Sequence, residues 1–135
     1  MVHFGEPFFL YKMKFQDLPY SRPNLDEITS KLNSLIQYFS KANSAQSQID
    51  LMNQIRDVRN EMESSKTIVS IRHSINTTDK FYDTENKFFD ENSPAYGAII
   101  NKYYKAVVDS EFKKELSEEF GPHFFNLAKV TVESF

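Results

Sequence analysis

The apolar residues between Ala45 and Ile75 recur at helical spacing, and this feature constrains the fold more than any other. The pattern predicts one amphipathic helix of about 30 residues, about 45 Å long at a rise of 1.5 Å per residue. No segment of the chain shows the sustained alternation that is typical of a strand. The apolar stripe consists of Ile49, Met52, Ile55, Val58, Met62, Ile68, Ile71 and Ile75.

A second amphipathic helix of about 17 residues is predicted just before this one. Asn24 is placed to cap it, and Glu27 completes the spacing of a capping box. The polar loop from Lys41 to Ser44 is short, so the two helices should form an antiparallel hairpin. The segment from Leu18 to Pro23 should be extended, because proline disfavours helix in the residue before it. The apolar face of the helix carries Leu25, Ile28, Leu32, Leu35, Ile36 and Phe39.

Cap and breaker residues predict shorter helices in the rest of the chain. Thr78 or Asp79 should cap a third helix that ends near Asn92. Ser93 and Pro94 resemble a cap followed by a first helical position, which predicts a new helix from Ala95 to Asp109. Ser110 should cap a helix over Glu111–Phe120, and Gly121-Pro122 should end it. A last helix follows, with Phe124, Phe125, Leu127, Val130 and Val132. The expected fold is all-α: an antiparallel helical hairpin followed by shorter packed helices in an up-down, bundle-like arrangement.

The composition excludes several classes of function. A net charge of −3 gives no support for nucleic-acid binding, which needs a basic surface. The absence of cysteine excludes disulfides, a thiolate nucleophile and thiolate metal ligands, and it favours a reducing compartment. No apolar run is long enough for a signal-peptide core or a membrane span. We therefore expect a soluble, cytoplasmic protein.

The stretch from Ile71 to Pro94 is the most informative part of the chain, because charged and aromatic residues alternate there. Phe81, Tyr82, Phe88 and Phe89 lie at helical spacing among acidic residues, so some charges must lie close to buried aromatic rings. Burial of a charge is costly unless it is paired. The thirteen Phe and seven Tyr are more than a small helical domain usually hides, so we expect some rings to face a partner.

Histidine spacing argues against a metal site within this chain. The three histidines, His3, His73 and His123, do not form a His-Glu-x-x-His motif, and none follows a Glu by three residues. His73 is better interpreted as a hydrogen-bonded core or interface residue, and His123 as a surface residue. We assign no catalytic, cofactor-binding or metal-ligating residue.

Other polar residues have a structural and a functional interpretation. Asp79 and Asp83 lie one turn apart and could form an acid-base pair, but a solvated helix face with acids in its first turn is by far the preferred explanation. A weaker hypothesis is a di-metal carboxylate bundle that uses Asp79, Asp83 and Glu85. Arg56 and Arg59 flank the apolar stripe, which favours structural ion pairs over ligand binding. Without basic residues around them, Tyr96, Tyr103 and Tyr104 are better interpreted as core or interface packing than as a stacking platform.

Four segments, taken in order, resemble a known family: MKFQDLPYSRPNLDE from Met13, IRDVRNEM, SIRHSINTTDKFYDTENKFFDENSP and EFKKELSEEFG. Over Met13 to Phe135 the chain resembles the N-terminal region of bacterial oligoendopeptidase F, one of the thimet-oligopeptidase-like zinc metallopeptidases. Residues 1–12 depart from the pattern, as an N-terminal extension or expression remnant. Residues 13–135 are then the helical N-terminal domain of an oligoendopeptidase-like protein.

The resemblance implies a non-catalytic helical portion of a peptidase that cleaves short peptides, where it helps to wall the substrate channel. In that family zinc is held by a His-Glu-x-x-His helix and a later Glu in the C-terminal part. No position here matches those ligands, so the chain alone is expected to be inactive. Its expected partners are the missing catalytic domain or, through aromatic surface, a second copy. The alternative is a self-contained helical protein-interaction module that holds a partner helix in an aromatic groove.

Overall fold

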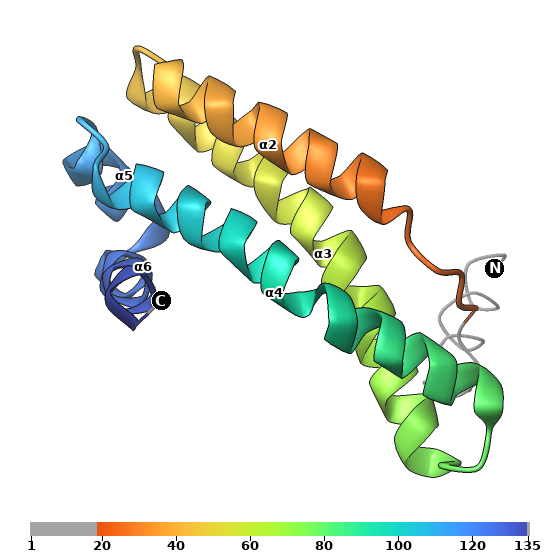
Figure 1. Cartoon of the computed structure of the whole chain (residues 1–135). Helices are drawn as coiled ribbons and strands as arrows, with labels where there is room; N and C mark the ends of the chain where they lie inside the picture. The colour runs from red at the N-terminus through yellow and green to blue at the C-terminus, as the bar shows by residue number, and fades with distance from the viewer. Residues whose placement is uncertain (1–18, 135) are drawn as a thin grey trace, which may run out of the picture.

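The computed structural model describes residues 19–134, and within this range every regular element is an α-helix. The prediction of an all-α fold is therefore confirmed for the described part of the chain. The predicted extension over residues 1–12 lies outside the described residues. The helices, labelled as in Figure 1, are α2 (Leu25–Lys41), α3 (Ala45–Ile75), α4 (Lys80–Val108), α5 (Lys113–Phe120) and α6 (Pro122–Ser134).

The predicted hairpin is present, and α4 packs against both of its helices. Figure 1 shows α2, α3 and α4 as three long helices, with α5 and α6 gathered beside the C-terminal end of α4. Asn24 accepts a hydrogen bond from the Glu27 amide at 3.2 Å, and Ser44 accepts one from the Ser47 amide at 3.1 Å. The two caps fix where α2 and α3 begin. The 31 residues of α3 confirm the long helix that its apolar stripe predicts.

One predicted boundary is wrong: α4 does not end near Asn92 but runs through Pro94 to Val108. Proline lacks the N–H that would bond to the carbonyl of Asp90, which is why the sequence suggested a break. Pro94 and Asp90 are both exposed, so water can satisfy that carbonyl. Phe89 before the proline and Ile100 after it are buried in the same core. Packing on one face therefore outweighs the local cost of proline on the other.

The α5 boundary is also shifted, because Ser110 forms a turn before the helix begins at Lys113. The Ser110 hydroxyl oxygen accepts a hydrogen bond from the Phe112 amide at 3.0 Å. Gly121 ends α5 as predicted, with φ of 90°, a conformation that glycine adopts at little cost.

Ser110 also belongs to a buried group of uncharged polar atoms, which we call the neutral centre: the Phe39 carbonyl, the Gln48 side chain and the Ser110 hydroxyl. Ser110 donates to Gln48 Oε1 at 2.5 Å, and Gln48 Nε2 donates to the Phe39 carbonyl at 3.1 Å. Gln48 and Ser110 are both buried. Because these hydrogen bonds satisfy the buried polar atoms, they join the α2–α3 hairpin to the α4–α5 junction without a buried charge.

A single apolar core connects the helices, with α4 contributing more of its residues than any other element. Among the described residues, no helix is long and apolar enough to cross a membrane. The buried core residues are Ile28, Leu32, Ile36, Phe39, Met52, Ile55, Met62, Val69, Phe89, Ile100, Tyr103, Tyr104, Val107, Leu116 and Ala128.

Candidate functional site

The charged residue that the aromatic-acidic stretch buries is Glu85 on α4, which is 4% exposed. Its partner is Arg22, in the extended segment that precedes α2. Arg22 Nε donates to Glu85 Oε1 at 2.9 Å, and Arg22 Nη2 donates to Oε2. The Arg22 guanidinium also lies over the Phe88 ring, 4.2 Å from its centre. This two-point pairing with stacking is geometry that arginine provides and lysine does not.

Tyr20 completes the group that we call the charged centre: Tyr20, Arg22 and Glu85. The Tyr20 hydroxyl donates to Glu85 Oε1 at 2.8 Å, and its ring meets the edges of Phe81 and Tyr82. Hydrogen bonding from Arg22, opposed by burial and aided by Tyr20, holds the pKa of Glu85 below its ordinary value. Burial and the bond to Glu85 raise the pKa of Tyr20. Glu85 is therefore kept ionised and Tyr20 is kept as a donor.

A second set of contacts joins the end of α3 to the start of α4. His73 Nε2 lies 3.4 Å from Asp83 Oδ1, and Lys87 Nζ lies 3.3 Å from Asp83 Oδ2. Arg72 donates a hydrogen bond to the Tyr82 hydroxyl. His73 is half-buried at this helix interface, where Asp83 is its acidic neighbour.

The three carboxylates of the di-metal hypothesis have separate partners. Asp79 caps α4 by accepting a hydrogen bond from the Phe81 amide at 2.9 Å. Asp83 forms its contacts with His73 and Lys87. Glu85 accepts hydrogen bonds from Arg22 and Tyr20. Across residues 19–134, no three His, Asp or Glu side chains come together as metal ligands. His123 is exposed on α6, and His3 lies outside the described residues. The side chains that the structure describes therefore do not fit a catalytic zinc ion.

The arginines and tyrosines singled out from the sequence are mostly structural. Arg59 Nη1 donates to the Tyr104 hydroxyl at 3.0 Å and Nη2 to Glu63 at 3.3 Å. Tyr103 and Tyr104 are buried in the core, as the packing interpretation predicts. Arg56 is exposed and lies 3.8 Å from Asp57.

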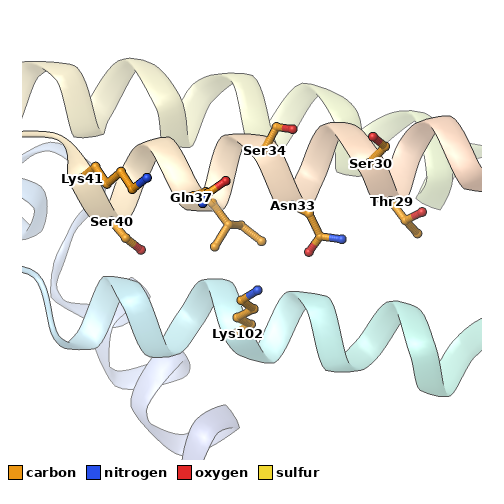
Figure 2. A pocket seen from close by; sticks show the side chains of 9 residues that line it. Thr29, Ser30, Asn33, Ser34, Gln37, Ser40, Lys41 and Lys102 are labelled. Carbon is orange, nitrogen blue, oxygen red and sulfur yellow. The ribbon is translucent and has the colours of Figure 1, made fainter.

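A groove of about 630 Å³ lies between α2 and α4 (Figure 2). Hydroxyl and amide side chains of α2 form most of its lining, and α4 contributes Lys102. Figure 2 shows Lys102 extending from α4 toward α2, while Asn33 and Ser40 point from α2 toward α4. The lining residues are Thr29, Ser30, Asn33, Ser34, Ile36, Gln37, Ser40, Lys41 and Lys102.

Reasoning from the sequence missed both this groove and the Arg22–Glu85 pair. A signal for the groove exists, because Thr29, Asn33, Gln37 and Ser40 are spaced by four, four and three residues and so share one face of α2. The ion pair leaves no such signal, since its members are 63 residues apart.

The chain matches a family model described as the peptidase M3 N-terminal domain over residues 15–135. It is similar to the solved structure of Pz peptidase A with an inhibitor, at 35% identity and a TM-score of 0.87, over 90% of this chain and 22% of that chain. It is also similar to a structure assigned as oligoendopeptidase F, at 33% identity and a TM-score of 0.87, over 91% of this chain and 22% of that one. No curated protein matches the chain.

Proposed function

Because the chain belongs to the peptidase M3 N-terminal domain family, we propose that it is the non-catalytic helical N-terminal portion of a zinc-dependent oligopeptidase. In this role it helps to wall the channel through which short peptides reach the catalytic zinc. The zinc ion and its ligands belong to the remainder of the enzyme, and the chain contributes a rigid helical surface. A cytoplasmic location, which the lack of cysteine favours, is part of the proposal.

One observation carries the proposal: the chain superposes with a TM-score of 0.87 on a peptidase of which it spans 22%. At 35% identity the shared fold extends over 90% of this chain. The matched segment is therefore a part of a larger peptidase fold.

The charged centre fixes the position of the segment that precedes α2. It ties the extended segment before α2 to α4 through Arg22 and Glu85, whose carboxylate also accepts from Tyr20. A buried pair of this kind costs desolvation, so its main effect is to specify one position for the segment. A channel wall needs such a fixed position if it is to exclude folded proteins and admit short peptides.

The outer face of α6 carries exposed apolar side chains, which supports the proposal that this portion contacts a partner. Leu127 and Val130, three residues apart on the same face, are 57% and 58% exposed. Two neighbouring apolar side chains on one helix face can form the centre of a surface that another element covers. We assign the remainder of the peptidase as the occupant, because relatives of known structure are several times longer than this chain.

An activity assay tests the proposal. The purified chain is mixed with zinc and a short internally quenched peptide, with and without a chelator. We expect no chelator-sensitive turnover, because no catalytic ligand set is present among the described residues. Sustained turnover that a chelator abolishes would contradict the proposal.

The second candidate is a self-contained interaction module, and the same exposed face of α6 favours it. Light scattering tests the α6 face on which both candidates depend, when the chain is compared with a Leu127→Glu variant. Self-association of the chain that the variant abolishes indicates an apolar surface that a partner covers. A clean monomer in both forms would count against α6 as a docking face.

A further inference from the structure

We propose that the groove between α2 and α4 is a peptide-binding subsite, in which Lys102 binds the C-terminal carboxylate of a short peptide. The inference rests on the proposed role in a peptide channel and assigns that role to named residues. The groove has a volume of about 630 Å³.

The length and the chemistry of the groove suit an extended peptide. Its wall on α2 runs from Thr29 to Ser40, which is about 17 Å at 1.5 Å per residue. An extended chain rises by about 3.3 Å per residue, so the groove accommodates about five peptide residues. Asn33 and Gln37 are exposed amides, each of which can donate to and accept from a peptide backbone.

The charge in the groove has one sign. Its lining contains Lys41 and Lys102 but no Asp or Glu, although the chain as a whole carries a net charge of −3. Among the described residues, neither lysine takes part in an ion pair. Lys41 stands in the last turn of α2, where the helix dipole by itself favours a cation. Lys102 has no such explanation, because it lies within α4 and extends toward α2 (Figure 2).

This chemistry favours an extended peptide over a helix of another protein. A helix that lies in a groove is held by apolar anchors at helical spacing. Here Ile36 is the apolar member of the lining, and it is buried under the polar rim. Hydroxyls, amides and cations instead match a peptide backbone that ends in a carboxylate.

The test is an NMR titration of the nitrogen-15-labelled 135-residue chain. The probes are a pentapeptide of alternating alanine and glycine with a free C-terminal carboxylate, the same peptide with an amidated C-terminus, and inorganic phosphate. We expect the free-acid peptide to shift amides of residues 33–41 and 98–102 and to bind about fivefold more tightly than the amidated peptide at low salt. Lys102→Gln should remove this difference. Lys66→Gln, an exposed lysine on α3 outside the groove, should preserve it.

Each remaining outcome overturns the inference. Equal affinity for the two peptides would exclude a carboxylate subsite, and a response to phosphate alone would indicate a general anion site. Peptide-induced shifts outside the groove would end this assignment but leave the proposed channel role standing. The channel role fails separately, if the chain by itself shows chelator-sensitive peptide turnover.

Discussion

The charged centre and the neutral centre both join segments that are far apart in the sequence, one through ionised side chains and the other through uncharged ones. The charged centre joins Arg22 to Glu85 across 63 residues, and the neutral centre joins Gln48 to Ser110 across 62 residues. In the neutral centre both hydrogen-bond partners, Gln48 and Ser110, are buried. In the charged centre Glu85 is buried, whereas the Arg22 side chain is 46% exposed.

This difference shows that position in the fold selects the kind of polar contact. The neutral centre lies between helix ends in the core, where an uncharged network avoids the cost of desolvating ions. The charged centre lies where an extended segment crosses α4, and there a half-exposed arginine retains part of its hydration. The contribution of the neutral centre to stability should not change with pH, whereas that of the charged centre should.

The largest losses of stability should come from truncation of core side chains, and they should be similar in the two regions, because one apolar core extends through both. Phe39→Ala near the neutral centre and Phe89→Ala near the charged centre each remove a ring that is at most 2% exposed. Each should lower the free energy of unfolding by about 4 kcal/mol. Urea denaturation measures both values. A loss below about 1 kcal/mol for either variant would show that its region is poorly packed.

The next largest effect should come from the neutral centre. Gln48→Leu leaves the Ser110 hydroxyl without its buried acceptor, and it should lower the free energy of unfolding by about 2 kcal/mol. Because no charge is removed, the loss should be the same at pH 7 and pH 4. The matched control is Gln54→Leu on the exposed side of α3, which should change stability by at most about 0.5 kcal/mol. Equal losses for the two variants would show that the hydrogen bonds of the neutral centre do not stabilise the fold.

A smaller loss is expected from the charged centre at pH 7. Glu85→Gln retains one acceptor oxygen for Tyr20 but loses the charge that Arg22 pairs with. Since Arg22 is partly solvated, the loss should be about 1 kcal/mol. Glu91→Gln, an exposed change on the same helix, serves as the control in the same denaturation experiment. If Glu85→Gln were neutral, the segment before α2 would be held by the aromatic contacts alone.

The smallest effect is the pH dependence that separates the two regions. The pKa of Glu85 is lowered in the folded protein, so its stabilisation is complete above the ordinary value of 4.5 and disappears as the pH falls through the folded pKa. The difference in unfolding free energy between the wild type and Glu85→Gln should therefore shrink below pH 4.5. A difference that stays constant down to pH 3 would contradict the assigned ion pair.

Local pattern predicted the helices well where apolar residues repeat, as in α2 and α3. It failed at Pro94, because the signal for a break is local whereas the packing of Phe89 and Ile100 that overrides it is tertiary. It also could not pair Arg22 with Glu85, although it indicated that some charges in that stretch lie close to buried aromatic rings. The α2–α4 groove depends on two helices at once, so the polar stripe on α2 alone did not identify it.

The most direct test of the central claim is a complementation assay. A peptidase of this family that has lost its equivalent N-terminal helices is assayed with a quenched short peptide, before and after this chain is added. We predict that the chain, which is inactive alone, restores chelator-sensitive turnover by completing the channel wall. Turnover by the folded chain itself, or no change in the truncated enzyme when it is added, would contradict the account.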